Sequence, residues 1–125
     1  MLKKIAFTVY PVTDVDRART FYEKVLGLQV GANGGHEGMF WVEYDLPGGG
    51  CLAISNATPD APSAKAGGTI AFEVDDLDAL VSHLKANDVP ILAPDVIRGP
   101  NCRMVPCADP DGNSIILHQL DEASR

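Results

Sequence analysis

The chain has 125 residues, 46% of them hydrophobic and 22% charged, which is the length and composition of one globular domain with a sizeable core. Ten Lys and Arg residues against seventeen Asp and Glu residues give a formal net charge of −7, and no basic run exceeds the pair Lys3-Lys4. Nucleic acids and anionic membrane surfaces are recognised by clustered basic residues, so we expect neither as a partner.

The cysteines and the first residues predict a cytoplasmic protein. Cys51, Cys102 and Cys107 make an odd count, without a CxxC pair or zinc-like spacing. The chain passes directly into a strand-like run, so we expect no signal peptide, and no apolar stretch has the length of a membrane span. Free thiols in a reducing compartment fit this pattern.

The first predicted elements are a strand and a helix. Residues 5–10 (IAFTVY) are rich in β-branched and aromatic side chains, which is typical of strands. Asp14 is a good N-cap for a helix over residues 15–26, where apolar side chains recur at helical spacing. Gly27 suits the left-handed conformation at the end of this helix.

Two strands and a linker follow. The Gly-rich residues 31–38 are interpreted as a loop, and residues 39–46 (MFWVEYDL) and 51–55 (CLAIS) as strands joined by a turn. Residues 57–68 contain Pro, Ser, Ala and Gly without an apolar period, which indicates a linker.

The pattern then starts again. Residues 69–74 (TIAFEV) form a predicted strand, and Asp76 caps a second helix that ends near Asn87. Short strands are predicted at residues 89–92 and 102–105. The sequence DPDGN at residues 109–113 is a turn before a last strand over residues 115–120.

An internal repeat decides the fold class. Residues 5–9 and 70–74 are identical at four of five positions, and each run is followed by an Asp-capped helix and further strands. Each copy alone would leave an apolar sheet face exposed, so the two copies must pack. We predict one α+β domain over residues 1–125, made of two βαβββ modules at about residues 1–56 and 69–121 that form a cupped mixed sheet with the helices outside.

Three motifs in this order resemble the vicinal-oxygen-chelate superfamily, also called the glyoxalase/bleomycin-resistance/dioxygenase superfamily. The first is V-T-D at residues 12–14, followed by Ala18, Phe21-Tyr22 and Leu26-Gly27; the second is FEVDDL at residues 72–77, and the third is DPDGN. The resemblance covers nearly the whole chain. It implies a substrate held in the cup of the sheet, often with a divalent metal, and a homodimer.

The positions that carry metal ligands in metal-dependent relatives hold other residues here. Counting seven residues back from Asp14 gives Phe7, although the repeat alignment points to Lys4 instead; the same count in module two gives Thr69. The last ligand position is Ile116, and the strand at residues 51–55 has no Glu, Asp or His. We therefore expect no cofactor at the usual site.

A displaced site is an alternative. Strand alternation places Glu43, Glu73 and His118 inside the cup, framed by Trp41 and Cys102. Two carboxylates and an imidazole can bind a divalent metal, or act as general base and acid. Each residue also has a structural interpretation: Glu73 pairs with a basic residue at the rim, His118 lies at a rim or interface, Trp41 is pocket wall or core, and Cys102 is a small apolar residue.

Three functions remain open. The first, which the lost ligand positions favour, is a metal-free protein that binds a small molecule without transforming it. The second is a lyase-, isomerase- or dioxygenase-like enzyme with Glu73 and His118 as catalytic residues, with Glu43 as an optional third residue and a displaced divalent metal. The third is an accessory interaction module. The residues expected to contact the ligand are Phe7, Trp41, Glu43, Thr69, Cys102 and Ile116.

Overall fold

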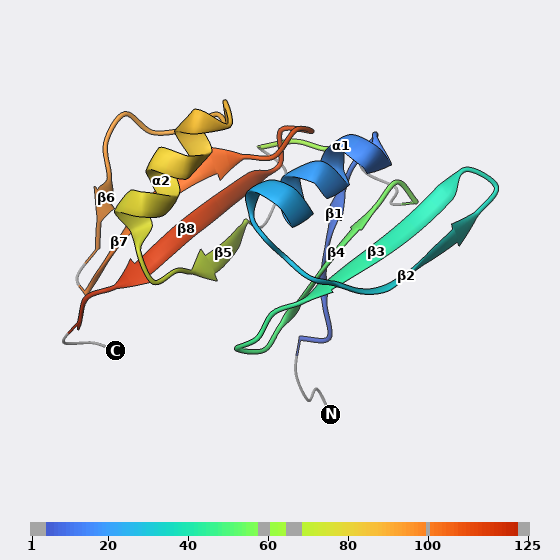
Figure 1. Cartoon of the computed structure of the whole chain (residues 1–125), viewed down its shortest axis with the longest axis horizontal. Coiled ribbons are helices and arrows are strands. Elements are labelled where there is room, and N and C mark those ends of the chain that lie inside the picture. The colour runs from blue at the N-terminus through green and yellow to red at the C-terminus, as the bar shows by residue number, and fades with distance from the viewer. Residues whose placement is uncertain (1–4, 58–60, 65–68, 100, 123–125) are drawn as a thin grey trace. The chain divides into compact units, whose positions relative to one another are not determined.

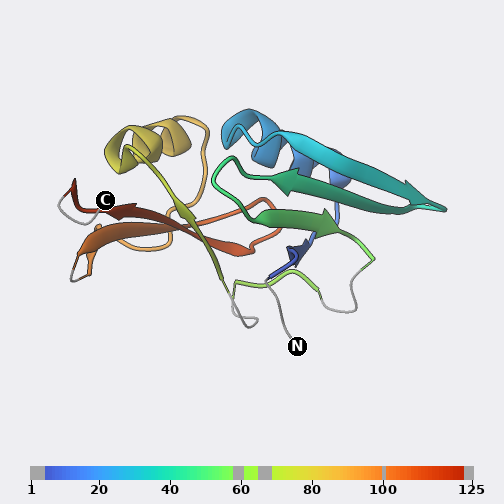
Figure 2. The same ribbon diagram turned by 90° about the horizontal axis from the view of Figure 1, so that it is seen from below.

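The computed structural model describes residues 5–57, 61–64, 69–99 and 101–122, and the chain divides into two compact units, Met1–Pro62 and Ser63–Arg125. Each unit has the element order βαβββ, so the predicted fold class is confirmed (Figure 1). Within each unit the helix covers one face of a four-stranded mixed sheet (Figure 2). The face of each sheet away from its helix is called the far face below. In the described part of the chain, no helix is long and apolar enough to cross a membrane.

Module one consists of β1 (Thr8–Pro11), α1 (Val15–Arg19), η1 (Thr20–Val25), β2 (Val30–His36), β3 (Met39–Asp45) and β4 (Cys51–Ser55). Its strand order is β1-β4-β3-β2, and only β1 and β4 are parallel.

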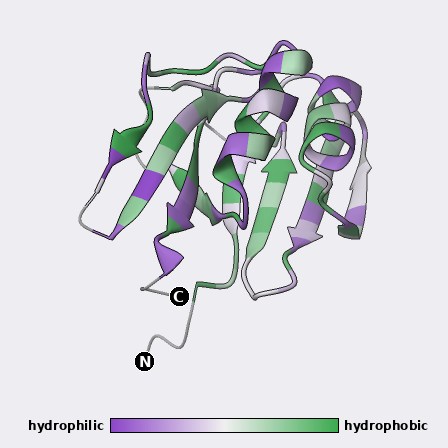
Figure 3. Ribbon diagram, turned by 60° about the vertical axis from the view of Figure 1, so that its left-hand side comes forward, coloured by the Kyte–Doolittle hydropathy of each residue, from purple (hydrophilic) through white to green (hydrophobic). Residues whose placement is uncertain are grey.

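Alternate residues of this sheet face the helix. Val42 and Tyr44 of β3 and Leu52 and Ile54 of β4 are buried, and the ring of Tyr44 lies 5.8 Å from that of Tyr22 in the helical segment. The period of two follows from the pleat of a strand. Figure 3 shows the ribbon coloured by hydropathy, with both hydrophobic and hydrophilic residues on the strands.

The first helix begins where Asp14 predicted it. The Asp14 Oδ1 accepts a hydrogen bond from the Arg17 N–H at 3.0 Å. The segment then widens into a π-helix, in which the Leu26 N–H bonds to the Phe21 carbonyl five residues earlier. Leu26 is the C-terminal cap, as the sequence indicated.

The prediction of a loop over residues 31–38 was wrong. The Gly-rich stretch forms most of β2, an edge strand paired with β3. Gly35 has a positive φ of 145°, and a Cβ there would lie 2.0 Å from the Met39 carbonyl oxygen, so the close approach of the two strands requires glycine.

Module two consists of β5 (Ile70–Glu73), α2 (Leu77–Ala86), β6 (Ile97–Arg98), β7 (Cys102–Ala108) and β8 (Ser114–Leu120). Its strand order is β5-β8-β7-β6, with β5 parallel to β8. Leu77 and Leu84 of α2 are fully buried, as are Ile115 and Leu117 of β8 on the face that the helix covers.

The strand expected at residues 89–92 is absent, and Ile91 forms only an isolated bridge with Cys107. Two single hydrogen bonds connect this segment to β7, from Leu92 N–H to the Pro106 carbonyl and from Ala108 N–H to the Pro90 carbonyl. Pro90 has no N–H to donate, so a regular ladder does not form there. The pairing strand is β6 instead.

Candidate functional site

An aromatic pair lies on the far face of module one. Trp41 and the half-buried Glu43 alternate along β3 with the buried Val42 and Tyr44, so they point away from the helix. The ring of Phe7 meets that of Trp41 edge to face, with centroids 5.2 Å apart and planes at 86°. Phe7 is 45% exposed and Trp41 is half-buried, so the pair presents aromatic surface that the module itself does not cover.

A carboxylate is fixed beside this aromatic pair. The Trp41 Nε1–H donates to Glu43 Oε2 at 2.8 Å, and the Cys51 Sγ lies 3.9 Å from Glu43 Oε1. Asp45 and Cys51 are register partners. Burial and then the charges of Asp45 and Glu43 raise the pKa of the Cys51 thiol, so this cysteine is not an activated thiolate.

The far face of module two brings together the two residues that the sequence proposed as catalytic. Glu73 and His118 are register partners in the parallel pair β5–β8. The Glu73 Oε1 lies 2.6 Å from His118 Nδ1, while its Oε2 accepts a hydrogen bond from Leu120 N–H at 2.9 Å. The side chain of Glu73 is 51% exposed and that of His118 27%, so the pair is accessible on this module. The carboxylate orients the imidazole and makes Nδ1 its protonated nitrogen.

Other predicted site residues lie on the same far face. Cys102 lies opposite Leu120 at the start of β7, and Ile116 lies between its partners Ala71 and Pro106. Thr69 precedes β5, and its hydroxyl is 2.8 Å from that of Ser114.

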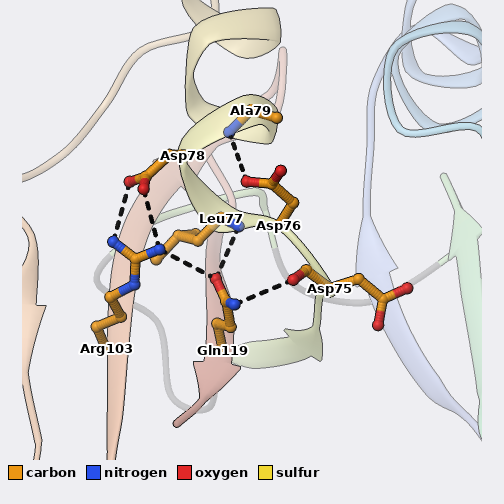
Figure 4. A network of polar contacts seen from close by, with 7 residues as sticks. All are labelled: Asp75, Asp76, Leu77, Asp78, Ala79, Arg103 and Gln119. Carbon is orange, nitrogen blue, oxygen red and sulfur yellow. Dashed lines mark hydrogen bonds and ion pairs between the residues drawn. The ribbon is translucent and has the colours of Figure 1, made fainter. Parts of the chain in front are cut away.

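Arg103, the basic neighbour of Cys102 in the sequence, points to the helix side of the sheet. It forms a two-pronged ion pair with Asp78 at 3.0 and 3.1 Å (Figure 4). It is therefore held away from the Cys102 thiol, which gains no activating cation from it.

One positioning residue, Gln119, was missed. Its Oε1 accepts hydrogen bonds from Leu77 N–H at 2.9 Å and Arg103 Nη2 at 3.2 Å, and its Nε2 donates to the Asp75 carbonyl at 3.0 Å (Figure 4). These bonds hold the turn between β5 and α2 next to Glu73. The available signal was a polar residue that continues the buried row of Ile115 and Leu117.

The predicted set of Glu43, Glu73 and His118 is divided between the two units. Glu43 belongs to Met1–Pro62, whereas Glu73 and His118 belong to Ser63–Arg125. Each unit therefore has its own polar arrangement on its far face: a carboxylate with two aromatic rings in module one, and a carboxylate–imidazole pair in module two.

The sequence matches a family model. The model of the Glyoxalase/Bleomycin resistance protein/Dioxygenase superfamily matches residues 4–117. The chain belongs to this superfamily. The resemblance inferred from the three motifs is thus confirmed. No curated protein matches the sequence.

Solved structures agree with this membership. TnmS3, an antibiotic-binding protein from Streptomyces sp. CB03234, is 26% identical with a TM-score of 0.79, over 96% of this chain and 98% of that one. The trypanothione-dependent glyoxalase I of Leishmania major is 27% identical with a TM-score of 0.76, over 98% and 89%. The fosfomycin resistance protein FosX from Listeria monocytogenes shares the fold, with a TM-score of 0.80 at 17% identity, over 100% and 99%.

The residues at the positions where the resemblance places metal ligands are poor donors for a divalent metal. A phenyl ring at residue 7 and an alkyl chain at residue 116 have no donor atoms, and the Thr69 hydroxyl is engaged with Ser114. The strand β4 offers a thiol and a hydroxyl but no imidazole or carboxylate. Among the described residues, no three His, Cys, Asp or Glu side chains are grouped to hold a metal ion.

Proposed function

We propose that this superfamily member binds a small organic molecule on the far faces of its sheets, without a divalent metal and without transforming the molecule. One observation carries the proposal. Three of the positions where the resemblance places metal ligands are occupied by Phe7, Thr69 and Ile116, and β4, where the fourth would lie, has no carboxylate or imidazole group. A face of rings and alkyl chains with few polar groups is typical of sites for small organic ligands.

The aromatic pair of module one supports a binding role. Phe7 and Trp41 expose ring surface next to one fixed carboxylate, and aromatic rings contribute much of the contact energy in ligand sites. The similarity to the antibiotic-binding protein TnmS3 favours the same interpretation. The residues proposed to contact a ligand are Phe7, Trp41 and Glu43 on the far face of module one, and Thr69, Cys102 and Ile116 on the far face of module two.

A ligand screen tests this proposal. Trp41 is the only tryptophan of the chain, so its fluorescence reports binding at the aromatic pair without added labels. We expect at least one aromatic natural product in an antibiotic library to quench Trp41, to raise the Tm in proportion to its concentration, and to be recovered intact by mass spectrometry. Chemical conversion of every bound compound would contradict the proposal.

A second function is favoured by the Glu73–His118 pair. Because the Glu73 carboxylate accepts a hydrogen bond from Nδ1 of His118, Nε2 of the imidazole is left as a proton acceptor. This is the arrangement of a general base that is oriented by a carboxylate. We propose isomerase- or lyase-like proton transfer as the alternative, with His118 as base and Glu73 as its orienting partner; no step passes through a metal.

The alternative has its own assay. The hemithioacetals of methylglyoxal with glutathione and with trypanothione are suitable probes, because a 27% identical protein is a trypanothione-dependent glyoxalase I. The enzyme hypothesis predicts turnover without added metal that His118→Gln removes and Glu73→Gln reduces, with the pH profile displaced in the second variant. Turnover that survives His118→Gln unchanged would refute the role of this pair.

The assembly and location follow from the family resemblance and the thiols. We propose a cytoplasmic location, since Cys51, Cys102 and Cys107 are all free thiols. We propose a homodimer from the family resemblance. Light scattering of the purified protein at several concentrations checks the dimer. A ligand-free interaction module is the remaining alternative, and it requires that the screen find no ligand.

A further inference from the structure

We propose that the ligand is an organic cation, a positively charged nitrogen attached to an aromatic or apolar body, and that it binds at Phe7, Trp41 and Glu43. This inference rests on the proposed binding function and deepens it by naming the ligand class. The site lies on the far face of module one and needs no contribution from module two.

The aromatic part of the site is suited to a cation. Trp is the strongest aromatic partner for a positive charge, since the faces of its indole carry negative potential. The edge-to-face contact with Phe7 and the hydrogen bond to Glu43 fix the Trp41 ring by two independent interactions. A fixed ring with exposed surface binds a ligand at lower entropic cost than a mobile one.

The carboxylate of Glu43 can accept a further hydrogen bond. Glu43 Oε2 accepts the Trp41 indole N–H, whereas the partner near Oε1 is the weak thiol donor of Cys51 at 3.9 Å. Among the residues that the structure describes, no Lys, Arg or His side chain forms an ion pair with Glu43. A carboxylate accepts at two oxygens, so Oε1 can receive an ammonium or amidinium N–H, or lie against a quaternary nitrogen.

The charged residue nearest to Glu43 on this face is also negative. Asp45 follows Glu43 by two residues on the same face of β3, and among the described residues it too forms no ion pair. Burial is the main cause of the raised pKa of the Cys51 thiol, and the negative charges of Asp45 and Glu43 raise it further. The net charge of −7 attracts cations at longer range.

A matched pair of probes isolates the charge. Thioflavin T is a cationic benzothiazolium, and 2-(4-dimethylaminophenyl)-6-methylbenzothiazole is the uncharged molecule of nearly the same shape. Both are titrated against the intact chain at fixed ionic strength, with quenching of Trp41 as the readout. We expect the cation to bind at least about tenfold more tightly, which is the effect of one charge–carboxylate contact and one cation–π contact.

Two variants assign the preference to the site. Glu43→Gln keeps an oxygen for the Trp41 N–H and removes the charge, so it should weaken the cation about tenfold and leave the neutral probe unchanged. Glu37→Gln changes the net charge equally at an exposed turn residue and should leave both affinities unchanged. Equal loss in both variants would overturn the inference, because only the overall charge would then matter.

The outcomes separate the two proposals. Binding to the double variant Trp41→Phe with Phe7→Ala, which has no tryptophan, is measured by isothermal titration calorimetry. Equal binding of both probes to the intact chain, abolished in this double variant, overturns the cation preference and leaves the binding function standing. Binding of neither probe, in protein whose antibiotic-library screen is also negative, overturns both. A cation preference lost only in Glu43→Gln supports both.

Discussion

Gln119 is the residue whose loss should most weaken the support of the carboxylate–imidazole pair. In Gln119→Ala three hydrogen bonds disappear: two that its Oε1 accepts, from Leu77 N–H and Arg103, and one that its Nε2 donates to the Asp75 carbonyl. Each contributes about 0.5–1.5 kcal/mol net. Partial rehydration of the exposed groups reduces the sum, so we expect a loss of about 2 kcal/mol and a fall in Tm of roughly 8 °C.

Two comparisons make the test specific. Gln29→Ala removes the same side chain at an exposed position and should change the unfolding free energy by less than about 0.5 kcal/mol. Arg103→Ala breaks an ion pair whose Asp78 side chain is 73% exposed, and it should destabilise the chain less than Gln119→Ala does. Urea unfolding of the three variants at neutral pH provides the values. If Gln119→Ala were as stable as Gln29→Ala, the bonds of Figure 4 would not hold the β5–α2 turn.

Three further predictions concern buried and half-buried groups. Burial raises the pKa of the Cys107 thiol from 9.0 to about 12, so between these pH values the thiol ionises only in the unfolded chain. The free energy of unfolding should therefore fall by up to roughly 4 kcal/mol by pH 12. Cys107→Ala should flatten this decline in urea titrations at alkaline pH. The pKa of Glu23 is held below 4.5 by the hydrogen bond from Arg19 and then by that from Tyr44, so stability falls as the pH drops below 4.5. Tyr44→Phe should cost about 1 kcal/mol at neutral pH and weaken this acid dependence, and equal acid slopes would refute the assignment. Asp109→Ala should lower the free energy of unfolding by about 3 kcal/mol, because the buried carboxylate accepts three hydrogen bonds within the turn. Asp109→Asn keeps one acceptor oxygen and should lower it less. Comparing the Tm values of the two variants tests this order.

Local signals identified most of the fold. Asp14 and Asp76 cap the two helices as expected, each by accepting the N–H three residues later, because an N-cap depends only on neighbouring residues. The repeated IAFxV run indicated two copies of one module, and each unit does place its first strand beside its last strand. The register of the repeat was wrong, because β1 begins at Thr8, after residues 5–7, whereas β5 begins at Ile70.

The errors arose where pairing with a distant strand decides the structure. Glycines in residues 31–38 indicate a turn locally, yet β3 pairs with them and makes β2 an edge strand. Residues 89–92 have strand-like side chains, but Pro90 prevents a regular ladder and the pairing moves to β6.

The site was predictable to the level of strand faces. Alternation placed Glu73 and His118 on one face and Trp41 and Glu43 on one face, and the structure shows both arrangements. The hydrogen bond between Glu73 and His118 depends on the register of β5 against β8, across 45 residues of sequence, and no local pattern encodes that register. For the same reason Gln119 was not recognised.

The central claim, a binding protein without the metal of many relatives, is tested most directly by elemental analysis of the full chain purified without chelator. The residues at positions 7, 69 and 116 and in β4 predict divalent metal at background level. A stoichiometric content of about one Mg, Mn, Fe, Co, Ni or Zn ion per chain would contradict the account, and it would move the assignment to an enzyme with a displaced metal site.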